Sequence, residues 1–146
     1  MLSNPWRSNI ATRTAVGDDG ALLRMPIVRV LFTNPKNEKQ VEVGCLIDSG
    51  ADDIFLNTRL ADVLGIDITQ GAKKEYQGIT SAPVVASEQF LSMKIEPDTH
   101  QFNVVCSFLP DLPVFGLLGQ NGFFDNYKVV FKRYDNIFEL MPVEEK

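Results

Sequence analysis

Short apolar runs recur along the chain, and in two of them apolar and polar residues alternate with the period of a half-buried β-strand. The runs are bounded by turn-forming residues, and those turns predict three antiparallel hairpins. Many short strands in this arrangement are typical of a closed or partly closed β structure. The predicted strands are 27–32, 41–47, 91–95, 102–108, 114–118, 128–131 and 137–140.

Two stretches are instead predicted to be short helices. The first covers 59–64, because Asn57 suits the residue that caps a helix start and Gly65 suits the position just past a helix end. A second short helix is expected over 120–127. The residues expected on one face of the first helix are Leu60, Val63 and Leu64.

The chain length of 146 residues predicts one domain that can bury a core without metals or disulfides. Residues 1–23 are mostly polar, and we interpret them as an N-terminal arm. Residues 24–146 contain the predicted strands and helices and form the expected folded domain.

The charge and hydropathy of the chain exclude several classes of partner. The formal net charge of −5 argues against nucleic acid, which favours a basic surface. No apolar run approaches the roughly 20 residues of a membrane helix. Residues 1–14 lack the apolar segment of a signal peptide. We therefore expect a cytoplasmic protein with neither a nucleic acid nor a membrane partner.

The cysteines and the histidine also limit the chemistry. Cys45 and Cys106 lie in separate apolar runs, so we expect two buried free thiols. His100 is the single histidine, which argues against a zinc site. Ser-His or Cys-His catalysis would have to use this one residue. No metal and no cofactor are expected.

The segment most suggestive of catalysis begins at Asp48. An apolar strand runs directly into this carboxylate and then into Ser49, Gly50 and Ala51. Carboxylates are rarely buried unless they are paired or functional, and Ser and Gly permit a tight turn with close backbone approach. Two adjacent carboxylates that share one proton can activate water as a base and donate a proton as an acid.

The sequence at 46–51 resembles the Asp-Thr/Ser-Gly-Ala signature of retropepsin-like aspartic proteases. The segment 117–119 resembles the family's second signature, two apolar residues and a glycine, and 76–81 lies where the family has its flap. The resemblance covers about residues 24–141. It implies an all-β, retropepsin-like closed β barrel of the acid-protease fold, with one or two short helices.

The resemblance also implies roles for individual residues. Asp48 would be the catalytic acid and base, Ser49 would brace the two catalytic loops, and Gly50 would leave room for a peptide or protein substrate. Water would be the nucleophile. The implied substrate-binding residues are Ala51, Asp52, Asp53, Tyr76, Gly78 and Ile79. The implied structural residues beside the active site are Leu117, Leu118 and Gly119.

A second copy of the chain is needed for a complete aspartate pair, because Asp-Ser-Gly occurs once. The sequence departs from the family at Gln120, where retroviral proteases carry an arginine that supports the dimer. Two alternatives remain open. One is a peptide-binding or assembly module on the same fold without turnover. The other is a small β-barrel binding protein in which Asp48 caps a turn, which requires that 117–119 lie away from Asp48.

Overall fold

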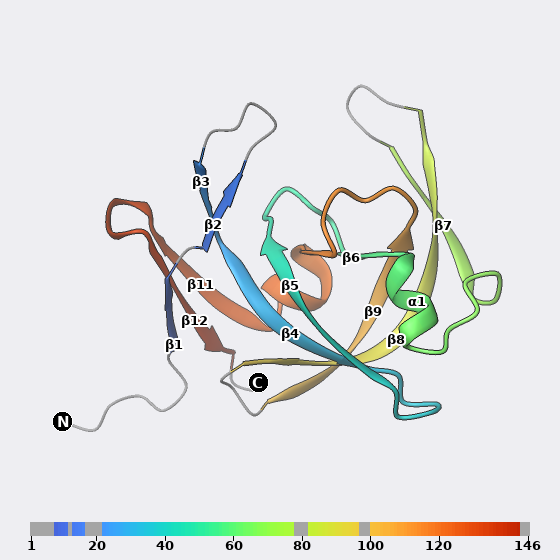
Figure 1. The fold of residues 1–146 in the computed structure, drawn as a ribbon. Helices are drawn as coiled ribbons and strands as arrows, with labels where there is room; N and C mark the ends of the chain where they lie inside the picture. The colour runs from blue at the N-terminus through green and yellow to red at the C-terminus, as the bar shows by residue number, and fades with distance from the viewer. Residues whose placement is uncertain (1–7, 12, 17–21, 78–81, 97–99, 144–146) are drawn as a thin grey trace.

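The computed structural model describes residues 8–11, 13–16, 22–77, 82–96 and 100–143 (Figure 1). Strands account for most of them, with short helical segments between. The strands are β1 (Ser8–Ala11), β2 (Arg13–Val16), β3 (Leu22–Met25), β4 (Ile27–Thr33), β5 (Gln40–Ile47), β6 (Ile54–Asn57), β7 (Ala72–Tyr76), β8 (Val84–Ile95), β9 (Gln101–Leu109), β10 (Gly116–Leu118), β11 (Tyr127–Lys132) and β12 (Ile137–Pro142). The helical segments are α1 (Arg59–Val63), η1 (Gln120–Phe124) and η2 (Arg133–Asp135).

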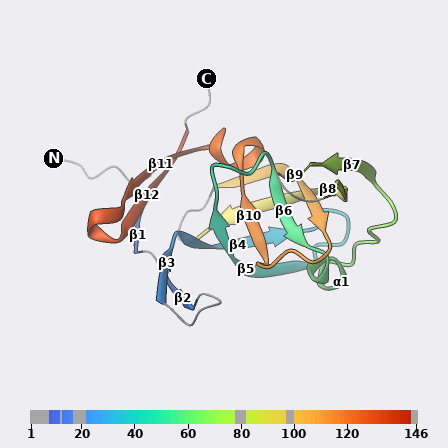
Figure 2. The same ribbon diagram turned by 90° about the horizontal axis from the view of Figure 1, so that it is seen from above.

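The central sheet closes into a barrel, as Figure 2 shows from above. Its hydrogen-bonded order is β4-β5-β10-β6-β9-β8-β7, and β4 also pairs with β8, so that six strands form a ring and β7 extends the sheet beyond it. The pairings of β10 with β5 and of β6 with β9 are parallel. The predicted all-β closed barrel is therefore confirmed.

The core fills the barrel because alternate residues of each strand point inward. In β4, for example, Val28, Val30 and Phe32 are buried while Arg29 is exposed. Each fully buried large apolar side chain stabilises the fold by roughly 1.5–3 kcal/mol. The largest fully buried side chains are Phe32, Phe108, Phe123, Phe138, Ile54, Leu56, Leu64, Leu91, Met93, Ile95, Leu118 and Val28.

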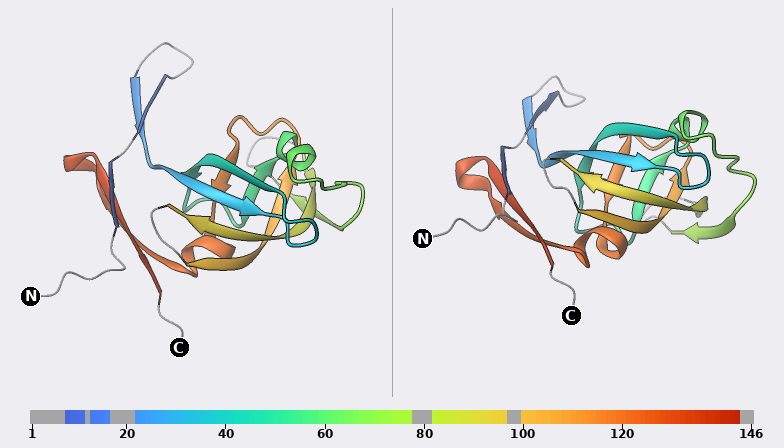
Figure 3. Two further views of the ribbon diagram at one scale, coloured as in Figure 1. Left: turned by 60° about the horizontal axis from the view of Figure 1, so that its bottom comes forward. Right: turned by 90° about the horizontal axis from the view of Figure 1, so that it is seen from below.

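A three-stranded sheet of order β1-β12-β11 lies on one side of the barrel, as Figures 1 and 3 show. The predicted hairpin at the end of the chain is confirmed as β11 and β12, and β1 pairs antiparallel with β12. A separate hairpin joins β2 and β3. The division between an arm at 1–23 and a domain at 24–146 stays a prediction, and β3 runs across that boundary.

The first helix is shorter than predicted, and its buried face differs. The Asn57 side-chain oxygen accepts a hydrogen bond from the Arg59 N–H, and Gly65 has the positive φ of 63° expected just past a helix end. The expectation for Val63 is wrong, because its side chain is 51% exposed. The face of this short helix that meets the barrel is formed by Leu60, Ala61 and Leu64.

Other boundaries also differ from the prediction, and β6 and β7 were not predicted as strands. The strand predicted at 114–118 is limited to β10, and the helix predicted at 120–127 is limited to η1, where Asn121 and Gly122 have non-helical backbone angles. The first half of β8, from Val84, was not predicted as strand because exposed valines and polar residues alternate poorly there.

The two cysteines are buried and free, as predicted. Among the described residues, no helix is long and apolar enough to cross a bilayer.

Candidate active site

Asp48 lies immediately after β5, at the point where β10 runs beside that strand. The Asp48 N–H donates to the Leu118 carbonyl oxygen at 3.0 Å, and Leu117 and Leu118 are in parallel register with Leu46 and Ile47. The two predicted signatures therefore lie side by side. The alternative of a binding protein in which Asp48 only caps a turn requires 117–119 to lie away from Asp48, and the structure places them beside it.

The loop after β5 folds around the Asp48 side chain. The Gly50 N–H donates to Asp48 Oδ1 at 2.9 Å, and the Ala51 N–H donates to the Asp48 carbonyl oxygen at 3.1 Å. Asp48 is half-buried, whereas Ser49 and Gly50 are exposed. The carboxylate is thus oriented by its own loop while the loop's surface remains open to solvent.

A second loop, residues 119–121 at the start of η1, binds the Asp48 loop, residues 48–53. The Gln120 N–H donates to the Ala51 carbonyl oxygen at 2.9 Å, and the Asn121 N–H donates to the Asp52 carbonyl oxygen at 2.8 Å. The Gln120 side-chain amide also donates to the Ser49 carbonyl oxygen at 2.8 Å. Gln120 therefore braces the Asp48 loop of its own chain through neutral hydrogen bonds.

Gly119 permits this close approach of the two loops. A Cβ atom at this position would lie 2.4 Å from the Asp53 carbonyl oxygen and 2.5 Å from the Ala51 carbonyl oxygen. Real Cβ atoms do not approach backbone oxygens so closely, and the φ of −108° is one that any residue adopts. The glycine is required here by space, not by backbone conformation.

Asp53 has a different environment from Asp52, which is exposed. Its side chain is nearly buried and accepts hydrogen bonds from Lys74 Nζ at 2.8 Å, from the Tyr76 hydroxyl at 2.5 Å and from Asn121 Nδ2 at 2.9 Å. Burial acts to raise the pKa of Asp53, but these hydrogen bonds and the Lys74 charge outweigh it and hold the pKa below its ordinary value.

Tyr76 ends β7 and completes this network. Its hydroxyl is 2.7 Å from Ser107 Oγ, and its ring packs edge-on against Phe55 with centroids 4.7 Å apart. Burial first, and then the hydrogen bond to Asp53, raise the pKa of the Tyr76 hydroxyl. The hydroxyl therefore stays protonated and donates to the carboxylate.

Three members of this network, Lys74, Ser107 and Asn121, were not predicted from the sequence. Lys74 lies two residues before Tyr76 in a strand, so both side chains are on one face, and this spacing could have identified Lys74. The other predicted site residues, Gly78 and Ile79, lie outside the described residues. The individual site assignments stay predictions.

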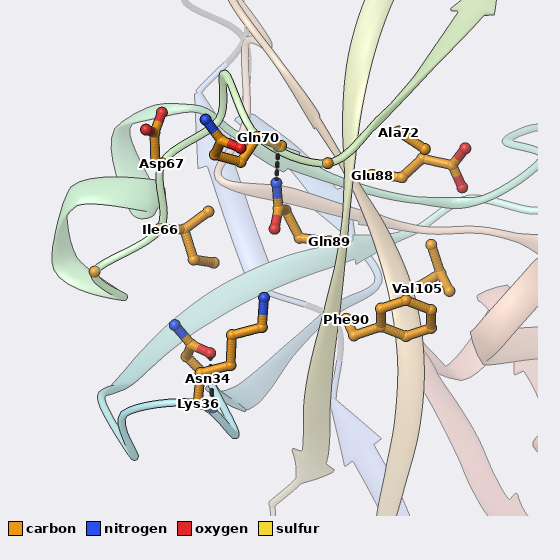
Figure 4. Close-up of a pocket in the computed structure, with 12 residues that line it drawn as sticks. Asn34, Lys36, Ile66, Asp67, Gln70, Ala72, Glu88, Gln89, Phe90 and Val105 are labelled. Atoms are coloured by element: carbon orange, nitrogen blue, oxygen red, sulfur yellow. Dashed lines mark hydrogen bonds between the residues drawn. The ribbon is translucent and has the colours of Figure 1, made fainter.

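A cavity of about 460 Å³ lies elsewhere on the barrel and includes none of the predicted site residues. It is bounded by the turn after β4, the segment between α1 and β7, and the part of β8 between its pairings with β7 and β4. Figure 4 shows the Gln89 side-chain amide donating to the Gln70 carbonyl oxygen there, at 2.7 Å. No described group of three or more His, Cys, Asp or Glu side chains is arranged to hold a metal ion.

The fold of this chain is similar to that of a solved protease structure. A retropepsin-like aspartic protease from Rickettsia conorii superposes with a TM-score of 0.62 at 21% sequence identity, over 92% of this chain and 89% of that one. An inhibitor complex of the EIAV protease gives a TM-score of 0.42 at 23% identity, over 66% of this chain and 82% of that one. No curated protein sequence matches.

The family model described as aspartyl protease matches residues 35–121, which is more than half of the chain. The matched segment begins in the turn before β5 and ends at Asn121, so it contains Asp48 and both clamped loops. The protein therefore belongs to the aspartyl protease family, has a retropepsin-like fold, and is an aspartic endopeptidase.

Proposed function

We propose that the protein hydrolyses peptide bonds as a homodimer, with two copies of Asp48 forming the catalytic pair. The observation that carries this proposal is the clamped loop, in which Asp48 is held by the Gly50 N–H and by β10. The loop fixes the direction of the carboxylate before any substrate arrives. Such preorganisation is what acid–base catalysis requires of its reacting group.

The chemistry follows from placing two carboxylates together. Like charges in contact cannot both ionise easily, so the pair holds one proton, as is established for aspartic proteases. The ionised carboxylate takes a proton from water while the water oxygen bonds to the substrate carbonyl carbon. The protonated carboxyl group supplies a proton to the substrate oxygen. Collapse of the tetrahedral intermediate then breaks the C–N bond: the carboxyl group that took a proton from water gives it to the leaving amine, and the other carboxylate recovers its proton from a hydroxyl of the intermediate.

The proposal of two copies rests on the composition of the chain. One Asp-Ser-Gly occurs in the sequence, so one copy supplies one catalytic aspartate. The exposed residues Ser49 and Gly50 leave this part of the loop accessible to a two-fold partner. Gln120 carries no charge and already donates to Ser49, so the interface would not rest on the arginine of the retroviral proteases.

The substrate is a peptide or protein in extended form. Ala51 and Asp52 follow the catalytic residue directly, and Tyr76 ends the neighbouring β7, so we retain them as proposed substrate contacts. Asp53 differs, because both its carboxylate oxygens already accept hydrogen bonds from within the chain.

The test compares the wild-type protein with Asp48→Asn at several concentrations, using a diverse peptide mixture at about pH 5, where one dyad proton is retained. Products are read by mass spectrometry. Cleavage by the wild type alone, rising faster than linearly with protein concentration, is the expected result. Equal cleavage by Asp48→Asn would refute the role of Asp48. No cleavage at any concentration would favour the peptide-binding module.

A further inference from the structure

Asp53 joins three separate segments of the fold at one carboxylate. It follows the Asp48 loop immediately before β6, and its Oδ1 accepts from Asn121 in η1. Its Oδ2 accepts from Lys74 and Tyr76, which both belong to β7. Its side chain is thus a direct link between the loop that carries Asp48 and the outermost strand of the barrel sheet.

The strand β7 has little else to hold it against the barrel. Among the described strands it pairs with β8 alone, and four of its five residues are exposed. Tyr76 is the exception, because its ring packs on Phe55 and its hydroxyl meets Ser107 as well as Asp53. Since the single Tyr76 hydrogen goes to the carboxylate, Ser107 donates the second bond. The end of β7 is therefore anchored through Tyr76.

We propose that Asp53 is a positioning residue that acts through Tyr76 and Lys74 to fix the end of β7 relative to the catalytic loop. This inference rests on the proposed function, because the position of Tyr76 matters for substrate only if Asp48 is catalytic. It replaces the predicted substrate contact of Asp53, whose acceptor oxygens are occupied. Loss of the link is expected to weaken substrate binding more than the chemical step.

The charges around Asp53 are compatible with this role at the acidity that an aspartate pair needs. Lys74 is the cation that faces it from β7, Tyr76 donates from the same strand, and Asn121 is a neutral donor from η1. Together they keep Asp53 ionised at mildly acidic pH, because they hold its pKa below the ordinary value. The anchor is thus intact under the conditions in which one dyad proton is retained.

The first arm of the experiment needs no turnover. Hydrogen exchange of the β7 backbone amides is compared among the wild type, Asp53→Asn, Tyr76→Phe and the control Glu75→Gln. Glu75 is a matched control because it lies between Lys74 and Tyr76 on the opposite, exposed face of the same strand. We expect exchange about tenfold faster in Asp53→Asn, since loss of a hydrogen bond to a charged group has that size of effect, and unchanged exchange in Glu75→Gln.

The second arm measures kcat and KM for one cleaved peptide with the same variants. Asp53→Asn should raise KM by about tenfold and leave kcat within about twofold. The rise in KM of the double variant with Tyr76→Phe should be smaller than the product of the two single-variant rises, because the two changes share the bond between the Tyr76 hydroxyl and the Asp53 carboxylate.

Several outcomes would overturn the inference. Equal β7 exchange in Asp53→Asn and Glu75→Gln would do so, as would additive effects on KM in the double variant. Tyr76→Phe keeps the test decisive if Asp53→Asn does not fold, because it removes hydrogen bonds and leaves the carboxylate in place. A wild-type protein that cleaves nothing would refute the proposed function instead, and β7 exchange alone would then decide whether Asp53 anchors the strand.

Discussion

Replacing Gly119 by alanine tests whether the close contact of two loops builds the catalytic site. The new Cβ would lie 2.4 Å from the Asp53 carbonyl oxygen, and ordinary contacts begin at 3.4 Å, so the loops must separate by about 1.0 Å (3.4 − 2.4). Both crowded oxygens belong to the backbone, and one of them, on Ala51, accepts the Gln120 N–H. Separation therefore weakens the clamp as well as the packing.

We expect Gly119→Ala to lower the free energy of unfolding by about 3 kcal/mol, at the upper end of the range for overpacking, because backbone cannot rotate away. With a urea m-value of about 2 kcal/mol/M, the unfolding midpoint should fall by about 1.5 M. Asp48-dependent cleavage should fall with it, even at urea-free conditions, since the loop that orients the carboxylate has moved.

Gly44→Ala is the matched control. A Cβ at Gly44 would meet a side-chain atom of Ile27 at 3.1 Å, and a small rotation of that side chain relieves the contact. Its midpoint should change by less than about 0.5 M, because removing a strand glycine also reduces the entropy of the unfolded chain. Equal midpoints and equal cleavage for the two variants would show that the loops can part freely and would refute the reasoning.

Three further predictions concern single groups. Burial raises the pKa of Cys45 to about 12 and also raises the pKa of Cys106. Native protein should therefore resist a thiol reagent at about pH 8, while unfolded protein reacts at both cysteines. Rapid reaction of the native state would contradict this prediction. The pKa of Asp53 is lowered by folding, so its stabilising effect is complete above the ordinary value of about 3.9 and is lost as pH falls through the lower folded value. Wild type should therefore be more stable than Asp53→Asn in thermal unfolding at about pH 5, and this advantage should shrink by about pH 2; a difference that does not depend on pH would exclude the mechanism. Gln120→Ala should lower the free energy of unfolding by about 0.5–1.5 kcal/mol in urea titrations, because the Ser49 carbonyl loses its side-chain donor. An unchanged midpoint would mean that this hydrogen bond does not brace the loop.

Most strands of the barrel and the neighbourhood of Asp48 could be predicted from local patterns in the sequence, whereas the barrel strand β6 was not predicted. Alternation in β9 and the second half of β8 marks which residues face the core. The apolar run of β5 ends abruptly at a carboxylate followed by small residues, which identifies a strand end and a tight turn without reference to distant residues. The pairing of 117–119 with this turn was predicted from the family resemblance, and the register of β10 with β5 confirms it.

The environment of Asp53 could not be predicted in the same way. Its partners Lys74, Tyr76 and Asn121 lie 21, 23 and 68 residues away in the sequence. Whether an acidic residue in a turn is solvated or buried depends on which strands the barrel places beside it, and that is a tertiary property. The exposure of Val63 was wrongly predicted for a related reason. So short a helix contacts the barrel through few side chains, and spacing alone does not determine which of them face it.

The clamped loops also bear on how the proposed catalytic pair would assemble. Apart from the Asn121 side-chain bond to the Asp53 carboxylate, the contacts between the loops are neutral hydrogen bonds within one chain, namely Asp48 N–H to Leu118, Gln120 to Ala51 and Ser49, and the Asn121 N–H to the Asp52 carbonyl oxygen. Bonds between neutral groups are little weakened by salt, unlike an arginine–carboxylate pair at a surface. Each copy would therefore bring a formed loop to the interface, and association would not bear the entropy of ordering it. In that case the dependence of cleavage on protein concentration reports the strength of the interface itself. Added salt should change this concentration dependence by altering association of the two copies, and should leave the Asp48 loop unchanged.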